Sequence, residues 1–300
     1  MTQSRLFQIL AASTTLTLTA CAADEGPNAD TASAEGTRIH MLRIQNSSDA
    51  PVANAVTPAI AGLTFFGGPV LTHVAVHPVF WNSATKLQSS INAFYPTIVS
   101  DSIYTSLLPQ YKNAAGTAIG TGTAVAGVVD TRTTASVTDA TVQTEIANLI
   151  NGTGGRPKLL PAPTANTYYP VHFPSGMTIT APDGSRSCVQ FCAYHGTFVL
   201  NGVNVNYGII PDIGQSGCAG GCGGSTVTNN TTSVASHELV EATTDPAVGL
   251  ATVFGPPLGW YDQVDNGEIG DLCNGQQAVV GTITVQKEWS NASKACKTTL

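Results

Sequence analysis

The stretch "SVASHELVEATTDP", residues 233–246, predicts a helix around which a folded domain can be organised. Three hydroxyl side chains can cap its start: Thr231, Thr232 and Ser233. The helix should end at Asp245, because the residue before a proline avoids helical backbone angles.

The helix carries the first half of the zinc-binding signature H-E-x-x-H, with Glu241 in place of the second histidine. His237 and Glu241 are four residues apart, so they project from one face, one turn apart, and can offer ligands to one ion. Glu238 occupies the position of the general base in H-E-x-x-H enzymes. A carboxylate ligand is compatible with zinc and also suits calcium or manganese. The alternative is an ordinary helix, in which His237 packs and both glutamates form a solvated face.

Further ligands must come from outside the helix. The segment "GWYDQVDNGEIGDLC", 259–273, offers Asp271 and Glu268, and "CAYH", 192–195, offers His195. The 259–273 segment does not follow the twelve-residue calcium loop, so an EF-hand is excluded. We expect Asp271, Glu268 or His195 to complete the metal site.

The flanking sequence predicts an α/β (α+β) fold in which helices pack on a mixed β-sheet. Residues rich in β-branched and aromatic side chains predict strands at 72–81, 122–130, 165–173 and within 191–211. Apolar residues at helical spacing predict helices in 83–99, 101–111 and 138–152. The last of these has Thr138 or Asp139 as its cap and Gly152 as its stop.

The first 65 residues read as targeting and tether. Residues 1–20 combine Arg5, an apolar stretch and the ending "LTAC", 18–21, which is typical of a lipoprotein signal peptide with Cys21 as the lipidated residue. The alternative is ordinary cleavage with no lipid. Residues 21–65 lack periodicity and predict a flexible tether, with a short strand in "IHMLRI", 39–44, and the folded domain at 66–300. We therefore expect an exported cell-envelope lipoprotein held to the membrane by its anchor, or a secreted protein if the lipobox is not used.

Seven cysteines support export, because six remain once Cys21 is set aside. Sequence alone does not choose among their pairings. We expect the local set Cys188–Cys192, Cys218–Cys222 and Cys273–Cys296. The competing interpretation is a four-cysteine metal site formed by the two C-x-x-x-C pairs.

Charge and composition narrow the partners. The net charge is -7, no basic cluster is present, and charged residues make up 10% of the chain against about 25% in typical soluble domains. These features exclude nucleic acid as the expected partner.

Four segments occur in an order that resembles plant EXORDIUM and phosphate-induced-protein-1-like proteins: "CVQFCAYHGTF", "VASHELVEATTDP", "WYD" and "EIGDLC". The resemblance covers roughly 70–297. It implies a secreted protein linked in plants to cell expansion, without a secure biochemical activity, and it suggests a zincin-like arrangement. The pattern positions of that family fall on His195, His237, Glu238, Glu241, Glu268, Asp271 and the six cysteines. The lipobox and tether depart from the plant proteins and indicate a bacterial relative.

Two functions follow from the residues. The first is a metal-dependent hydrolase, with a peptidase as the favoured class, in which zinc is bound by His237, Glu241 and a third ligand. Glu238 would be the base, and His195 or Tyr261 would stabilise the oxyanion. The second is a non-catalytic surface module that binds glycan or polypeptide around a structural metal or polar site. Its candidate stacking residues are Trp81, Tyr168, Tyr169, Trp260 and Tyr261.

Overall fold

The computed structural model describes residues 41–44 and 62–300, all of which belong to one compact unit. The predicted signal peptide 1–20, Cys21 and most of the predicted tether lie outside the described residues. Two pieces of the tether range are described, and both pair with the domain. The strand β1 (Met41–Arg43) pairs with β10, and β2 (Thr64–Phe65) pairs with β12 (Trp260–Tyr261).

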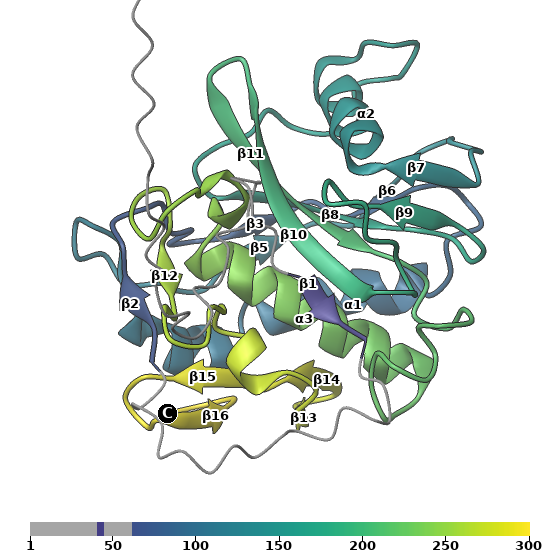
Figure 1. The fold of residues 1–300 in the computed structure, drawn as a ribbon. Coiled ribbons are helices and arrows are strands. Elements are labelled where there is room, and N and C mark those ends of the chain that lie inside the picture. Colours follow the sequence, from purple (N-terminus) through teal and green to yellow (C-terminus); the bar gives the residue numbers. More distant parts are fainter. Residues whose placement is uncertain (1–40, 45–61) are drawn as a thin grey trace, which may run out of the picture. The chain divides into compact units, whose positions relative to one another are not determined.

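The central element is a mixed sheet in the order β1-β10-β11-β8-β3-β5 (Figure 1). β4 also pairs with β8, next to β3, and β6 pairs with the other side of β4, next to β5 at the edge. The predicted mixed α/β architecture is therefore confirmed. β1, β10 and β11 are antiparallel neighbours, whereas the strands from β11 to the far edge run parallel. The sheet strands other than β1 are β3 (Ala75–Val76), β4 (Val79–Phe80), β5 (Thr123–Ala124), β6 (Val128–Val129), β8 (Thr167–His172), β10 (Phe191–Leu200) and β11 (Val203–Ile210).

Within the described residues, three α-helices pack around this sheet, and short strand pairs lie outside it. The helices are α1 (Gln88–Ile98), α2 (Asp139–Asn151) and α3 (Val227–Thr244), together with the π-helix η1 (Ile103–Leu107) and the 3-10 turns η2 (Leu108–Gln110), η3 (Val248–Leu250) and η4 (Asp271–Cys273). The outer strands are β7 (Ser136–Thr138), β9 (Thr178–Thr180), β13 (Gln277–Val280), β14 (Ile283–Gln286), β15 (Glu288–Ser290) and β16 (Ala295–Lys297). None of the helices in these ranges has the length and apolarity needed to cross a membrane.

The strand predicted over 72–81 is divided into β3 and β4 at His77-Pro78. Both halves pair with β8 in parallel register, at Thr167–Tyr168 and at Val171–His172. Proline has no N–H to donate to a sheet ladder, which explains the interruption. The predicted strand 122–130 is also found as two separate strands, β5 and β6.

Two hydrophobic cores lie on opposite faces of the sheet. Successive strand residues point to opposite faces, so Tyr168 of β8 packs with α1 and α3, whereas Tyr169 packs with α2. On β10 the same alternation sends Tyr194 toward Asp139 of α2 and leaves the next residue, His195, facing α3. α3 runs between the large sheet and the C-terminal strands β14 and β15, which are yellow in Figure 1.

The helix α3 begins earlier than predicted. Its N-cap is Thr226, whose Oγ1 accepts a hydrogen bond from Asn229 N–H, so the predicted capping by 231–233 is wrong. The predicted end before Asp245-Pro246 is confirmed. Residues 230–244 are all buried although many are polar. Serine and threonine hydroxyls make this possible by donating to carbonyls one turn earlier, as Thr243 does to Leu239 and Thr244 to Val240.

The disulfides differ from the predicted local set. Cys188 bonds to Cys218 and Cys192 bonds to Cys222, so the expected Cys188–Cys192 and Cys218–Cys222 pairs are wrong, and so is the four-cysteine metal site. The third expected pair, Cys273–Cys296, is confirmed. Cys192 lies in the extended strand β10, which carries it away from Cys188, and the glycine-rich loop before α3 folds back to meet both.

Candidate metal centre

Six side chains with possible ligand atoms meet between α3, β10 and the segment that leads into η4. Their burial is almost complete, because only Asp271 has more than 1% of its side-chain surface exposed, at 22%. They are His195 on β10, His237, Glu238 and Glu241 on α3, Glu268, and Asp271 in η4. The structure therefore brings together residues up to 76 positions apart in the chain, from His195 to Asp271.

One group of ligand atoms surrounds His237. Its Nε2 lies 3.1 Å from Glu241 Oε1 and 3.8 Å from Asp271 Oδ1. These three residues can each place one ligand atom within 4.8 Å of the other two. Ligand atoms bound to a tetrahedral zinc ion at 2.0–2.1 Å lie about 3.3 Å apart. The 3.1 Å from His237 Nε2 to Glu241 Oε1 is close to this spacing, and the 3.8 Å to Asp271 Oδ1 is longer.

A second group surrounds His195. Its Nδ1 lies 3.5 Å from Glu238 Oε2 and 3.6 Å from Glu241 Oε2, and its Nε2 lies 3.5 Å from Glu268 Oε1. His195 Nε2 also lies 3.3 Å from the carbonyl oxygen of Asp245. A ring that donates Nε2–H to this carbonyl keeps its lone pair on Nδ1, which faces the two glutamates of α3.

Gly270 allows the loop to approach α3 closely. A Cβ at this position would lie 2.6 Å from His237 Nδ1 and 2.9 Å from Glu241 Oε1, closer than real Cβ contacts. The next residue, Asp271, donates its backbone N–H to Glu241 Oε1 at 3.1 Å. The absence of a side chain at Gly270 therefore lets one loop supply both a ligand and a hydrogen bond to the centre.

Gln286 of β14 holds the other side of the His237 ring. Its Nε2 lies 2.7 Å from His237 Nδ1 and donates to the carbonyl of Gly270 at 2.8 Å, while its Oε1 accepts from Gly275 N–H. In this orientation the amide donates to Nδ1, which places the proton of a neutral ring on Nε2. A metal ion at Nε2, or a cationic ring, puts a proton on Nδ1 and requires the Gln286 oxygen there instead. The amide orientation of Gln286 is therefore coupled to the state of His237.

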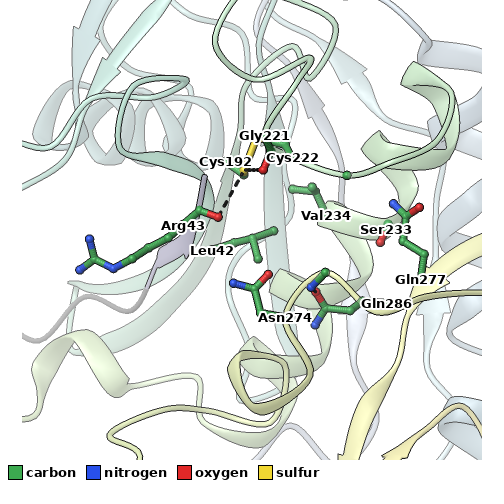
Figure 2. A pocket seen from close by; sticks show the side chains of 12 residues that line it. Leu42, Arg43, Cys192, Gly221, Cys222, Ser233, Val234, Asn274, Gln277 and Gln286 are labelled. Atoms are coloured by element: carbon green, nitrogen blue, oxygen red, sulfur yellow. Dashed lines mark hydrogen bonds between the residues drawn. A yellow bond between two sulfur atoms is a disulfide. The ribbon is translucent and has the colours of Figure 1, made fainter. Parts of the chain in front are cut away.

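Gln286 also borders a cavity of about 20 Å³ between β1, the Cys192–Cys222 disulfide and α3 (Figure 2). Leu42 and Val234 supply apolar walls, and Asn274 lies beside Gln286. Such a volume holds about one water molecule. β1 and Gln286, the neighbour of His237, therefore border the same cavity.

Electrostatics around the centre are dominated by buried carboxyl groups. Burial raises the pKa of Glu238 to about 7, against the opposing effect of His195 and His237. Burial also acts to raise the pKa of Glu241, but the two histidines outweigh it and hold that pKa well below its ordinary value. Burial alone would lower the pKa of His195 and of His237, and the surrounding carboxylates raise both well above the ordinary range.

Several buried atoms of this cluster have no hydrogen-bond partner. They are His195 Nδ1, His237 Nε2 and both carboxylate oxygens of Glu238 and of Glu268. Buried polar atoms are nearly always paired in folded proteins, and an unpaired one costs roughly 1–3 kcal/mol. The nearest polar neighbours of these atoms are histidine and carboxylate atoms of the same cluster, as in the 3.1 Å from His237 Nε2 to Glu241 Oε1. Two imidazole nitrogens and several carboxylate oxygens are the donor set that a transition-metal ion such as zinc or manganese takes. The residues present therefore fit a divalent metal ion.

Other predicted site residues lie elsewhere or play other parts. Tyr261 is in neither ligand group, and its hydroxyl donates to Asn266 Oδ1 at 3.0 Å. Four of the five aromatic residues suggested for sugar stacking are almost fully buried, so they are wrong as exposed platforms: Trp81, Tyr168, Tyr169 and Tyr261. Trp260 is half-buried and packs against Tyr111.

Sequence reasoning missed four neighbours of the centre: Asp245, Gly270, Gln286 and Glu288. Asp245 ends α3, and its Oδ1 accepts from Gly259 N–H. Glu288 of β15 is fully buried, and burial raises its pKa well above the ordinary value. Only Asp245, which lies one turn after Glu241 in the quoted helix, carried a signal in the sequence.

No protein-family model, curated protein or solved structure matches this chain.

Proposed function

We propose that this protein is a divalent-metal-dependent hydrolase whose ion is held by His237, Glu241 and Asp271. The observation that carries the proposal is that His237 Nε2 lies 3.1 Å from Glu241 Oε1 and 3.8 Å from Asp271 Oδ1, beside the buried Glu238, whose two oxygens have no hydrogen-bond partner. Zinc is the favoured ion, and manganese also suits imidazole together with carboxylate. Calcium fits less well, because it takes oxygen ligands and two imidazoles face this centre.

Glu238 is the proposed general base. It is next to His237 on α3, its two oxygens have no hydrogen-bond partner, and burial raises its pKa to about 7. A base works best when its pKa lies near the working pH. A bound ion would supply Lewis-acid activation of a carbonyl group and of water, and Glu238 would hold the proton taken from that water. Asp271, which is partly exposed, marks the side of the centre nearest to solvent.

A polypeptide or a glycan remains the proposed substrate class. An extended polypeptide could add to the outer edge of β10, but β1 occupies that edge through Met41 and Leu42. A peptide substrate would therefore have to displace β1 or enter beside Asp271.

We also propose that the protein is related to the EXORDIUM-like family and that it is exported. Three disulfides favour an oxidising compartment. Mass spectrometry of the protein from its native host tests the anchor, since a diacylated Cys21 at the mature N-terminus is expected. An unmodified N-terminus after Cys21 would instead indicate a secreted form.

The test of the proposed function is metal content together with hydrolysis. Purified protein should contain zinc or take it up after dialysis, and His237→Ala should lose it. Glu238→Gln should keep the metal and lose at least about 100-fold in hydrolysis of peptide or glycan libraries. Metal-free protein after loading, or a Glu238→Gln variant as active as the wild type, would refute the proposal.

A structural metal site is the second candidate, and the near-complete burial of five of the six ligand residues favours it. In that case both the wild type and Glu238→Gln bind metal, neither hydrolyses any library member, and removal of the metal lowers the melting temperature.

A further inference from the structure

The two oxygens of Glu241 face different histidines. Oε1 lies 3.1 Å from His237 Nε2, and Oε2 lies 3.6 Å from His195 Nδ1. The two triads that could each hold an ion therefore share this one carboxylate. A carboxylate that presents its oxygens to two ligand groups is the geometry of a bridge between two ions, which lie about 3.5–4 Å apart in two-metal sites.

The His195 side has its own complete set of ligands. His195, Glu241 and Glu268 can each place an atom within 4.8 Å of the others. His195 Nδ1 and both Glu268 oxygens lack hydrogen-bond partners, and both residues are fully buried. The Asp245 carbonyl lies 3.3 Å from Nε2 and Glu268 Oε1 lies 3.5 Å from the same nitrogen, whereas Nδ1 faces Glu238 and Glu241.

The centre holds more carboxyl groups than the first proposed ion would ligate. Glu238, Glu241, Glu268 and Asp271 surround two histidines. The lysine and arginine ion pairs found in the described ranges go to other carboxylates, namely Asp212, Asp130 and Glu145. One divalent ion at His237 balances the charge of Glu241 and Asp271. The carboxyl groups of Glu238 and Glu268 then remain buried beside His195 with no lysine or arginine partner, so each must be protonated or paired with a cationic His195 unless a second ion binds.

We propose that the centre is dinuclear: a second divalent ion is bound by His195 and Glu268, and Glu241 bridges it to the ion held by His237 and Asp271. This inference rests on the proposed metal site but adds a distinct one. It assigns His195 as a metal ligand in place of an oxyanion stabiliser. Glu238, whose Oε2 lies 3.5 Å from His195 Nδ1, stands beside the second ion.

The test is the number of ions bound by the full chain. Metal-free protein is titrated with Mn²⁺ or Zn²⁺, and bound metal per chain is measured by elemental analysis after gel filtration. Wild type should bind two ions. Glu268→Gln, which keeps the shape of the side chain but removes its charge, should bind one, and Asp271→Asn should weaken the other. Asp212→Asn is the matched control, because Asp212 pairs with Lys86 and belongs to neither triad.

Electron paramagnetic resonance of the Mn²⁺-loaded protein tests the bridge directly. Two ions joined by Glu241 should give an exchange-coupled spectrum, and Glu268→Gln should give the spectrum of an isolated ion. The metal content and the resonance spectrum of the wild type test the proposal even if a variant fails to fold.

The outcomes separate this inference from the proposed function. One ion per wild-type chain, unchanged in Glu268→Gln, would overturn the second site and leave the first intact. Two ions in both proteins would overturn the assignment of Glu268, and two uncoupled ions would overturn the bridge. No bound ion at all would overturn both proposals.

Discussion

Replacing Gly270 with alanine is the sharpest test of how the loop before η4 shapes the centre. The added Cβ would lie 2.6 Å from His237 Nδ1, 2.8 Å from His237 Cε1 and 2.9 Å from Glu241 Oε1. Non-bonded heavy atoms pack at roughly 3.5 Å, so the imidazole or the loop must move by nearly 1 Å. Metal sites require their ligands to be held to within about 0.5 Å.

The expected consequence is a loss of metal affinity of about 10- to 100-fold, the range seen when the support of a ligand is disturbed. Movement of the loop instead of the ring leads to the same result, since the Asp271 ligand and its N–H bond to Glu241 move with Gly270. The metal-free protein should also lose about 1–3 kcal/mol of stability through overpacking.

The assay is a competition titration of Zn²⁺ against a fluorescent chelator, combined with urea unfolding of the metal-free protein. Gly224→Ala is the control, because a Cβ there has no atom within 4 Å. Zinc affinity of Gly270→Ala within about twofold of the wild type would refute the reasoning, whatever happens to stability.

Three further predictions concern the surroundings of the centre. Burial lowers the pKa of His172 to about 3, so this side chain stays neutral in the native state. In the unfolded chain the same histidine takes up a proton below about pH 6.5. Stability is therefore lost as pH falls through this window, by up to about 1.4 kcal/mol per pH unit. Urea unfolding at pH 7, 5 and 4 should show the free energy of unfolding of His172→Gln rising relative to that of the wild type as pH falls, by about that amount per pH unit. The same pH dependence in both proteins would contradict this. Gln286→Leu should weaken zinc binding about 10- to 100-fold, because an ion at His237 Nε2 puts a proton on Nδ1 and the reoriented Gln286 oxygen that would accept it is lost. Gln286→Glu, which can only accept, should retain it, and equal affinities in the two variants would exclude this support. Leu42→Ala should cost about 2–4 kcal/mol in chemical unfolding, since Leu42 is 5% exposed and packs in the core with α3; a loss below 0.5 kcal/mol would show that β1 is not bound to the sheet in solution.

Local chemistry made some parts of the fold predictable. The Thr138 cap and the Gly152 stop of α2 were read correctly because capping depends on neighbouring residues. The start of α3 was missed because buried threonines and asparagines resemble a loop until their hydroxyls are seen bonded within the helix. The first predicted strand is broken at Pro78, which has no N–H to donate. Whether a donor was needed there depends on the neighbouring strands, and only the pairing with β8 defines them.

The pairing of cysteines shows the same division. Cys273 and Cys296 join two neighbouring segments, so sequence proximity was a good guide. The partners of Cys188 and Cys192 depend on how a glycine-rich loop folds back on β10, and no local rule contains that information.

By itself the sequence determined that His237 and Glu241 share one helix face and that Glu238 lies beside them, since helical geometry depends only on spacing. It also nominated His195, Glu268 and Asp271. Only the tertiary structure decided that two groups of ligands form and that Glu241 stands between them. Those relations depend on β10, α3 and the η4 loop meeting at fixed distances, and such long-range packing follows from the whole core.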